Sequence, residues 1–245
     1  MPTLHVLLKR EELDVTRLAG KAIVVLDVLF ATTTIVDAFH RGVACVYPAL
    51  NGEEATGVAA RLGACVLAGE HMARPIPGFR PATPLALADV AMRGEQMVYS
   101  TTNGTKALAT AGQAADAHVY AGALLNGRAL AAHIVSEHAE QTVLLVCCGS
   151  VDRFNLEDFH GAGHIIEHLL QLHSYRLTDA AHAALHAYRG CDSRSALFAS
   201  RVGRLMHEHA LGDEVEFACR SDSVNAVPML VDGRLVDACA ARIAA

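Results

Sequence analysis

The sequence has only three lysines and a net charge of −6, so it lacks the basic surface that a polyanion requires. This excludes nucleic acid as an expected partner. Long apolar runs are also missing, because the longest ones are interrupted by Asp27, by threonines or by glycine. None reaches the length that crosses a bilayer, and we expect no membrane partner.

The chain also lacks two marks of secretion. Its first ten residues do not combine a basic start with an apolar core, as a secretion signal does. The seven cysteines are an odd number without the spacing of a disulfide framework, which is typical of reduced thiols. Together these features predict a cytoplasmic protein.

Hydrophobic residues make up 52% of the 245 residues, enough for the core of one large α/β domain. No low-complexity linker divides the chain, so we expect a single domain over residues 1–245. The order strand, polar turn, helix recurs along the chain, which predicts an α/β fold with a mostly parallel sheet and helices on both faces. The expected strands are residues 4–8, 21–29, 43–47, 64–67, 97–99, 118–121 and 142–147.

Helical patterns lie between most of these strands, and the C-terminal region is typical of strands or a hairpin. The expected helices are residues 35–39, 52–62, 84–92, 105–111, 125–139, 177–186 and 195–209, with another that begins near residue 155. The expected C-terminal strands are residues 215–219, 224–231 and 234–238. Residues 74–84 are rich in proline and predict a long loop, which either covers a site with Arg80 or lies solvated on the surface.

The segment of residues 96–106 is the one around which the chain is organised. An apolar strand pattern stops at a cluster of hydroxyls, an asparagine and a glycine, and an alanine-rich helix follows. A strand, a tight turn and a helix N-terminus direct backbone amides at one place, which predicts a cradle for an anion. An ordinary polar connection is the alternative. The substrate-binding candidates here are Thr102, Asn103, Gly104 and Thr105.

Acidic residues follow two other predicted strands. Asp27 ends a buried strand and would need a partner or a cation there, although a role in capping a helix is the alternative. Residues 142–147 lead into Glu157 and Asp158, which point about 100° apart on a helix. If these strand ends meet, the carboxylates suit Mg²⁺, which prefers oxygen ligands. We expect Asp27 and Asp158 to be catalytic, with Asp27 and one of Glu157 and Asp158 as metal ligands.

Further candidates lie near these strand ends. The hydroxyl of Thr32 and the guanidinium of Arg153 are placed to contact a substrate. Cys147 and Arg153 also have the C-x5-R spacing of thiolate phosphatases, but this loop has one glycine and carries an acidic residue, so a structural cysteine is favoured.

Three histidines, His160, His164 and His168, recur every four residues and so share one face of a helix. Two of them could chelate zinc, but no His-Glu-x-x-His motif occurs and a polar helix face is favoured. His160 lies closest to the strand end and remains a possible contributor to the site.

The chain resembles the 2-phosphosulfolactate phosphatases over nearly its whole length. The matching segments are residues 25–29, 31–34, 69–70, 78–79, 101–105, 147–163 and 227–228. The resemblance implies a three-layer α/β/α fold and a Mg²⁺-dependent phosphatase of coenzyme M synthesis. It also implies that Asp27, Glu70, Asn103, Glu157 and Asp158 line the site, with Glu70 among the metal ligands.

The chain departs from this family at two places. Phe30 stands where the family usually has arginine, which removes a bidentate contact to an anion. Residues 80–84 replace an Asp-Leu-Gly-Asn-Ser-Pro segment, and Arg80 there could restore positive charge.

The leading hypothesis is a Mg²⁺-dependent phosphatase acting on a small phosphorylated acid. The alternatives are a small-anion-binding protein without turnover, and a hydrolase or lyase with a changed substrate. The apolar, alanine-rich helices also make a homodimer an expectation.

Overall fold

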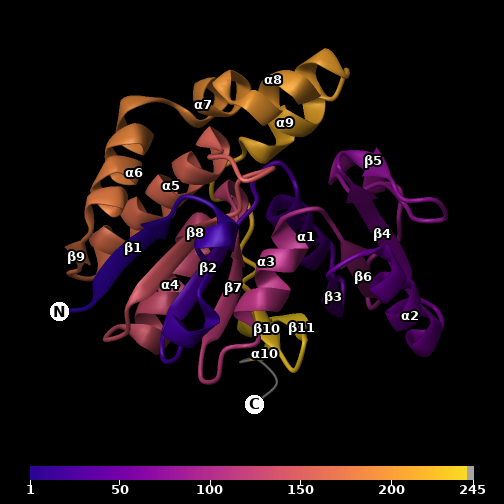
Figure 1. Cartoon of the computed structure of the whole chain (residues 1–245), viewed down its shortest axis with the longest axis horizontal. Coiled ribbons are helices and arrows are strands. Elements are labelled where there is room, and N and C mark those ends of the chain that lie inside the picture. Colours follow the sequence, from indigo (N-terminus) through magenta and orange to yellow (C-terminus); the bar gives the residue numbers. More distant parts are fainter. Residues whose placement is uncertain (242–245) are drawn as a thin grey trace.

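The strands of the protein join one mixed sheet that winds through the middle of the molecule (Figure 1). The structure is a computed structural model that describes residues 1–241, so the last four residues of the expected domain fall outside it. The sheet order is β5-β4-β6-β3-β11-β10-β7-β2-β8-β1-β9. The strands are β1 (Thr3–Leu7), β2 (Ala22–Leu26), β3 (Cys45–Ala49), β4 (Val66–His71), β5 (Arg74–Pro75), β6 (Gln96–Ser100), β7 (His118–Gly122), β8 (Val143–Cys147), β9 (Arg176–Leu177), β10 (Pro228–Val231) and β11 (Arg234–Asp237).

Helices connect most of these strands. The α-helices are α1 (Ala31–His40), α2 (Gly52–Leu62), α3 (Gly104–Ala111), α4 (Gly127–His138), α5 (Leu156–Leu172), α6 (Asp179–Gly190), α7 (Ser193–Ala199), α8 (Arg201–Glu208), α9 (Gly212–Ala218) and α10 (Ala238–Ala241). Short 3-10 helices occur at η1 (Arg10–Glu12), η2 (Val15–Arg17), η3 (Leu85–Leu87) and η4 (Leu124–Asn126). None of the helices in residues 1–241 is both long enough and apolar enough to cross a membrane.

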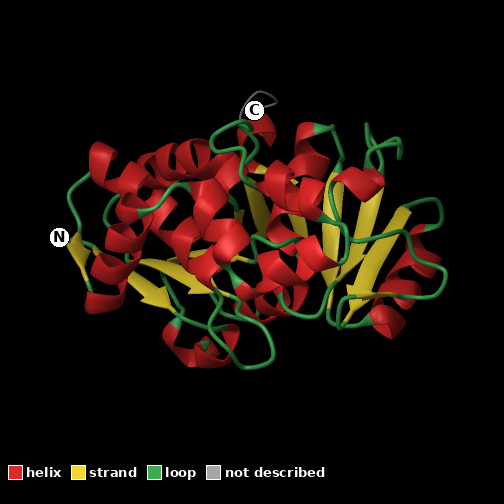
Figure 2. Ribbon diagram, turned by 90° about the horizontal axis from the view of Figure 1, so that it is seen from above, coloured by secondary structure: helices red, strands yellow, loops and turns green. Residues whose placement is uncertain are grey.

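The sheet consists of two parallel blocks joined by the C-terminal hairpin. One block contains β7, β2, β8, β1 and β9, and the other contains β3, β6 and β4. The hairpin of β10 and β11 is antiparallel to its neighbour on each side and pairs with each through one residue, Met229 with Tyr120 and Leu235 with Val46. The strands accordingly form two groups of different inclination (Figure 2).

Helices cover both faces of the sheet, which confirms the predicted α/β architecture. On one face α4, α5 and α6 pack on alternate residues of β1, β2 and β8, such as Val24 and Leu145. On the other face α1 and α3 pack on the intervening residues, such as Val25 and Val146. Helix α2 packs separately on β3 and β6. Burial on both faces explains why β2 and β8 are continuous apolar runs.

Three predicted elements differ from the observed ones. Residues 84–92 form only the 3-10 turn η3, because Glu214 accepts the amides of Leu85 and Ala86 while Arg41 donates to the carbonyls of Leu87 and Ala88. The predicted helix 195–209 is divided at Ser200, which caps α8 by accepting the amide of Gly203.

The predicted strand 215–219 is instead the helix α9. It buries Val215 and Ala218, which are three residues apart, and this spacing places them on one face of a helix.

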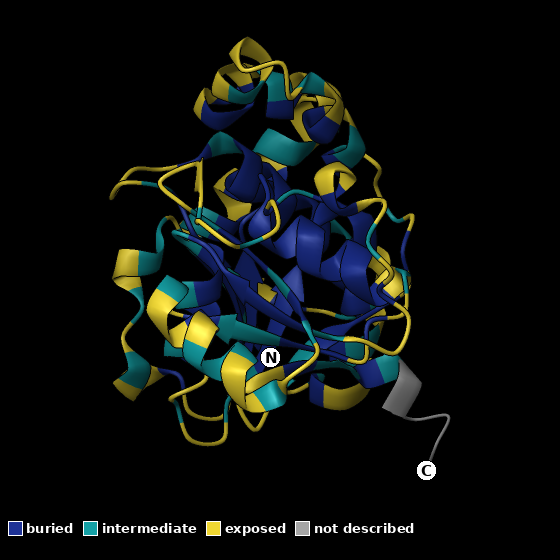
Figure 3. Ribbon diagram, turned by 90° about the vertical axis from the view of Figure 1, so that its right-hand side faces the viewer, coloured by how far each residue is buried: buried dark blue, intermediate teal, exposed yellow. Residues whose placement is uncertain are grey.

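The buried interior is polar at one place. Figure 3 shows buried residues concentrated at the centre of the molecule, with exposed residues on the outer helices. Within that interior, Asp27, Glu157 and Asp158 are each less than one-tenth exposed. Buried carboxyl groups are costly unless they are paired or bind a cation.

Candidate active site

The ends of β2 and β6 meet although four strands separate them in the sheet. At the usual spacing those two strands would lie about 24 Å apart across a flat sheet. Asp27 directly follows β2, and its carboxylate Oδ2 accepts a 2.7 Å hydrogen bond from the amide of Gly104, the first residue of α3. A Cβ at Gly104 would come within 2.8 Å of that oxygen and 2.6 Å of Ala31 Cβ. Only glycine therefore allows this approach.

Glu70, at the end of β4, fixes the turn that precedes α3. Its Oε1 accepts the amide of Thr102 at 2.6 Å, and its Oε2 accepts the Thr102 hydroxyl at 3.0 Å and the amide of Ala73 at 2.7 Å. The Thr102 hydroxyl in turn accepts the amide of Met72 at 2.7 Å. Glu70 thus holds its own backbone turn and the 101–105 turn together.

Asp158 forms hydrogen bonds to both the turn after β2 and the turn after β8. Its Oδ1 accepts the amide of Val28 at 2.9 Å and its Oδ2 accepts the amide of Gly149 at 3.0 Å. Gly149 has a φ of +61°, and a Cβ there would collide with the carbonyl of Arg153. Both oxygens of Asp158 are therefore committed to backbone groups that glycine geometry brings within reach.

Two buried polar groups beside Asp27 have no partner. Within residues 1–241, neither carboxylate oxygen of Glu157 accepts a hydrogen bond. The side-chain oxygen of Asn103 accepts none there either. Glu157 is only 1% exposed. Ser200 and Arg201 lie near enough to lower its pKa, but they do not form a hydrogen bond of normal geometry with it. Buried oxygens without donors are the groups that a cation would satisfy.

Burial raises the pKa values of Asp27, Glu157 and Asp158, and neighbouring carboxylates add to the effect on Asp27 and Asp158. Burial raises the pKa of Asp27 to about 7, with further contributions from Glu70 and Glu157 and an opposing one from the Gly104 amide. Burial also raises the pKa of Asp158, and the charges of Glu157 and Asp27 add to that effect. The pKa of Glu157 is raised by burial as well. Without a cation, the site therefore disfavours full ionisation of these carboxyl groups.

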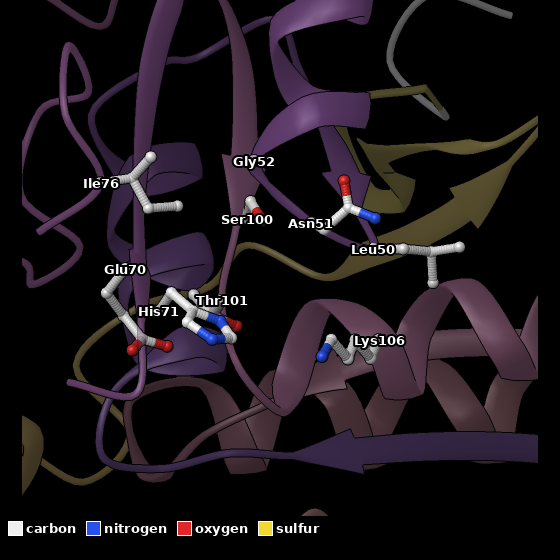
Figure 4. A pocket seen from close by; sticks show the side chains of 9 residues that line it. All are labelled: Leu50, Asn51, Gly52, Glu70, His71, Ile76, Ser100, Thr101 and Lys106. Carbon is white, nitrogen blue, oxygen red and sulfur yellow. The ribbon is translucent and has the colours of Figure 1, made fainter. Parts of the chain in front are cut away.

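A pocket of about 140 Å³ adjoins this cluster at the carboxyl ends of β3, β4 and β6. Lys106 from α3 and His71 from the end of β4 project into it, with Glu70 beside them (Figure 4). Lys106 forms no ion pair within residues 1–241. The complete lining is Leu50, Asn51, Gly52, Glu70, His71, Ile76, Ser100, Thr101 and Lys106.

Comparison with known proteins identifies the family of the chain. The profile of the 2-phosphosulpholactate phosphatase family matches residues 7–233. The chain belongs to this family. It is similar to a probable 2-phosphosulfolactate phosphatase of Deinococcus radiodurans, 36% identical over 90% of this chain and 92% of the relative. Similar relatives of the same name occur in Carboxydothermus hydrogenoformans (33% identical, 88% and 90%) and Symbiobacterium thermophilum (33%, 89% and 95%).

Membership in the 2-phosphosulpholactate phosphatase family confirms the resemblance seen in the sequence and makes this chain a member of a phosphatase family. The structure brings together the carboxylates of Asp27, Glu70, Glu157 and Asp158, which the sequence placed at three distant points. It also places Asn103 beside them, at the N-cap of α3.

The predicted amide cradle needs correction. The amides of Thr102 and Gly104 already donate to Glu70 and Asp27, and the amide of Thr101 donates to the Thr105 hydroxyl at 2.9 Å. The Thr32 hydroxyl accepts the amide of Asp27 at 3.0 Å. The amides of Thr102 and Gly104 therefore position the acidic residues of this phosphatase family member and are not free donors to a substrate.

The predicted cationic residues lie at the surface. Arg80 is exposed, and its backbone pairs with β4 through Leu67 and Gly69. Arg153 is exposed as well, and its backbone pairs with Ser150. Neither side chain forms an ion pair or hydrogen bond within the described part of the chain.

The thiolate mechanism is not supported. Cys147 is fully buried in the core, and burial together with the nearby Asp158 and Glu157 raises its pKa well above the ordinary value. The nearby amide of Gly149 donates to Asp158. The thiol therefore stays protonated and packs as an apolar group.

His160 faces away from the acidic cluster. Its Nε2 lies 3.1 Å from the Ser193 hydroxyl and its ring packs on Tyr188, while burial lowers its pKa to about 4. His160 is therefore a packed core residue between α5, α6 and α7. The prediction that it contributes to the site does not hold.

The sequence analysis missed Arg201, Lys106 and His71. Arg201 begins α8, donates to the hydroxyl of Ser150 and to Asn155 Oδ1, and lowers the pKa of Glu157. No strand precedes it, so the strand-turn-helix pattern could not indicate it. Lys106 and His71 each directly adjoin a predicted site residue, and that proximity was a signal available in the sequence.

Proposed function

We propose that this protein is a Mg²⁺-dependent phosphatase that hydrolyses the phosphate ester of a small acid, of the kind named for its relatives, 2-phosphosulfolactate. The observation that carries the proposal is Glu157, a carboxylate that is 1% exposed and unpaired among three other carboxyl groups. The free-energy cost of burying such a charged group is offset when a bound cation pairs with it.

The donor set fits Mg²⁺. Asp27 and Glu157 would hold the ion, with the side-chain oxygen of Asn103 as a further ligand, while both oxygens of Glu70 are engaged by the turns that it holds. All these donors are oxygens, and Mg²⁺ retains several waters in protein sites, so not every carboxylate has to contact it. When bound, the ion would neutralise the charge that develops on the phosphoryl oxygens and lower the pKa of a water molecule. Asp158, with both oxygens engaged by amides, positions the two turns.

Asp27 is the residue we assign to proton transfer. One of its oxygens is held by the amide of Gly104, which leaves the other able to accept a proton from the attacking water. Water attacks phosphorus, the bond between phosphorus and the ester oxygen breaks, and the departing alkoxide takes up a proton. The products are inorganic phosphate and the hydroxy acid.

Positive side chains flank the carboxylates and would bind the anionic substrate. Arg201 lies near Glu157 and would bind the phosphoryl group, since a guanidinium pairs with phosphate through two hydrogen bonds. Lys106 and His71 line the adjoining pocket and would hold the acid groups of the substrate. Glu70 borders both the pocket and the carboxyl cluster and so connects these two regions.

A changed substrate is the second candidate, and Phe30 favours it. This residue caps α1 three positions after Asp27, is 8% exposed, and packs in the apolar cluster with Val28 and Leu29. An aromatic ring offers no hydrogen bond to an anion. A phosphorylated acid without the sulfonate would then be preferred, and a protein that binds anions without turnover is the limiting case.

The test is phosphate release by the purified protein after treatment with EDTA, with and without added Mg²⁺. The substrates are 2-phosphosulfolactate, 2-phospholactate, phosphoglycolate and p-nitrophenyl phosphate. Release that requires Mg²⁺ supports the proposal, and the order of kcat/KM among the acids decides between the two candidates. Release that is unaffected by EDTA, or a thermal shift with substrate but no turnover, contradicts it.

A further inference from the structure

Away from the carboxyl cluster, two histidines of α5 and one aspartate converge on a single point. His164 Nε2 lies 3.2 Å from Asp222 Oδ1, and His168 Nε2 lies 3.0 Å from Asp222 Oδ2. The two histidines are four residues apart and share a helix face, whereas Asp222 follows α9. One ligand atom from each of the three side chains lies within 4.8 Å of the others.

We propose that His164, His168 and Asp222 form a binding site for Zn²⁺ or a similar divalent transition metal. Imidazole nitrogens and one carboxylate oxygen are the donors that such ions prefer, whereas Mg²⁺ prefers oxygen alone. Ligands in a tetrahedral zinc site are about 3.3 to 3.4 Å apart. The separations of 3.0 and 3.2 Å run to different oxygens of Asp222, and the three ligand atoms lie within 4.8 Å of one another. Enclosing an ion therefore requires the more distant pair of ligand atoms to approach by up to about 1.5 Å.

The surroundings hold each ligand in place. His164 is 1% exposed, its Nδ1 lies 3.0 Å from the Tyr188 hydroxyl, and its ring rests so closely on Gly127 that a Cβ there would collide with it. A hydrogen bond to the second ring nitrogen is the usual device that orients a metal-binding histidine. Asp222 has a φ of +55°, and its amide donates to the carbonyl of Leu124 at 2.9 Å.

Arg128 competes with a metal for the same carboxylate. Its amide donates to Asp222 Oδ1 at 2.8 Å, and its guanidinium lies 3.3 Å from Oδ2. The Arg128 side chain is 72% exposed, so the guanidinium can move into solvent while the amide contact stays. The His168 side chain is 15% exposed and gives an ion a route from solvent. Three protein ligands leave a fourth position for water.

Binding would connect three parts of the chain. The two histidines belong to the middle of α5, Asp222 ends the excursion of α7, α8 and α9, and Arg128 begins α4. That excursion also carries Arg201, which the proposed phosphatase mechanism uses. A metal at this point would therefore stabilise the segment that carries Arg201, without being part of the carboxyl cluster.

The test is titration of the metal-free full-length protein with Co²⁺, followed by visible absorption, and then competition with Zn²⁺. We expect the d–d bands of a tetrahedral Co²⁺ site at one equivalent, loss of those bands on adding Zn²⁺, and no effect of excess Mg²⁺. Zn²⁺ should also raise the melting temperature by several degrees.

Variants identify the ligands. Asp222→Asn keeps the shape of the side chain and tolerates the positive φ. Asp222→Asn and His168→Ala should each weaken Co²⁺ binding at least about 100-fold. His182→Ala, from the exposed i,i+4 pair His182 and His186 on α6, is the matched control and should bind as the wild type does. Arg128→Gln should tighten binding. Equal Co²⁺ affinity in the wild type and Asp222→Asn, or a spectrum without tetrahedral bands, would overturn the proposal and leave the Mg²⁺-dependent reaction unaffected.

Discussion

Asp27 and Gly104 are 77 residues apart in the sequence, and the amide of Gly104 donates a 2.7 Å hydrogen bond to the carboxylate of Asp27. This contact joins the end of β2 to the start of α3 and so connects the two parallel blocks of the sheet. It also places a carboxylate at the positive end of a helix dipole. The acidic cluster depends on this joint, because Glu70 and Asn103 are attached to the same turn.

Gly104→Ala should abolish this joint. The new methyl group would meet Asp27 Oδ2 and Ala31 Cβ, so Asp27 must move and kcat should fall at least about 100-fold. Gly57→Ala is the control, because Gly57 lies on α2 with only the Arg61 side chain near it. That change should leave activity intact and stabilise the helix by up to about 1 kcal/mol. Steady-state kinetics and thermal melting measure both variants, and equal activity in the two would refute the role of the joint.

Glu157→Gln and Asp158→Asn should affect stability in opposite directions. Without metal, Glu157→Gln removes an unpaired buried charge and should stabilise the protein by about 1 to 2 kcal/mol at pH 8. Asp158→Asn turns an amide group toward a backbone amide of Val28 or Gly149 and should cost about 1 to 3 kcal/mol. Urea unfolding in EDTA gives both values. Destabilisation by Glu157→Gln would mean that Glu157 has a partner in the folded protein.

Cys147→Ala should retain most of the activity. The thiol is fully buried and protonated, so its loss leaves only a small cavity and costs about 1 kcal/mol. The exposed Cys191 should react with iodoacetamide in the native protein whereas Cys147 should not. Complete loss of turnover in a folded Cys147→Ala variant would restore the thiolate mechanism.

Arg201→Ala should raise KM for a phosphorylated substrate at least about 10-fold, since its guanidinium lies near enough to Glu157 to lower the pKa of that carboxyl group and would pair with the phosphate. Arg201→Lys should recover only part of this loss, because an ammonium group lacks the bidentate geometry. Arg204→Ala, on the same helix and bonded to the carbonyl of Ala199, is the control. An unchanged KM in Arg201→Ala would exclude a contact between Arg201 and the substrate.

His138 should make stability depend on pH between about 6.5 and 4. Burial, with the charges of His118 and His133, lowers its pKa to about 4, so the unfolded chain binds a proton in this range and the folded protein does not. Stability should therefore fall as the pH falls through this window, by about 1 to 2 kcal/mol because the imidazole keeps some contact with solvent. His138→Gln preserves a partner for the Tyr120 hydroxyl and should show a shallower decline in urea unfolding. Parallel curves for the two proteins would contradict the assignment.

Much of the sheet could be predicted because its strands are buried on both faces. The continuous apolar runs of β2 and β8 are too short for a typical helix and therefore predict buried strands. The turn after β6 is marked by Asn103 and Gly104. The segment that became α9 was mistaken for a strand because seven residues are too few to separate a period of two from one of 3.6. The backbone of residues 84–92 is shaped by hydrogen bonds to the side chains of Glu214 and Arg41, which lie far away in the sequence and could not be foreseen from the local pattern.

The sequence predicted which acidic residues gather at the site, but it predicted their hydrogen-bond partners and roles less well. Asp27 directly follows a strand, and Glu157 and Asp158 lie in the first turn of the helix after β8, which a sequence shows. The partner of each amide in the 101–105 turn, however, depends on which carboxylate folds against it. Asp222 could not be connected with His164 and His168, because 54 residues separate it from the nearer histidine. The homodimer and the cytoplasmic location stay predictions.

Mg²⁺ binding is the most direct measurement of the central claim, that the buried carboxyl cluster binds one cation through Asp27 and Glu157. Isothermal titration of the EDTA-treated protein at pH 8 should show one site for Mg²⁺, and Asp27→Asn and Glu157→Gln should each weaken it by at least about 10-fold. Equal Mg²⁺ affinity in the wild type and both variants, or no binding by the wild type at millimolar Mg²⁺, would contradict the account.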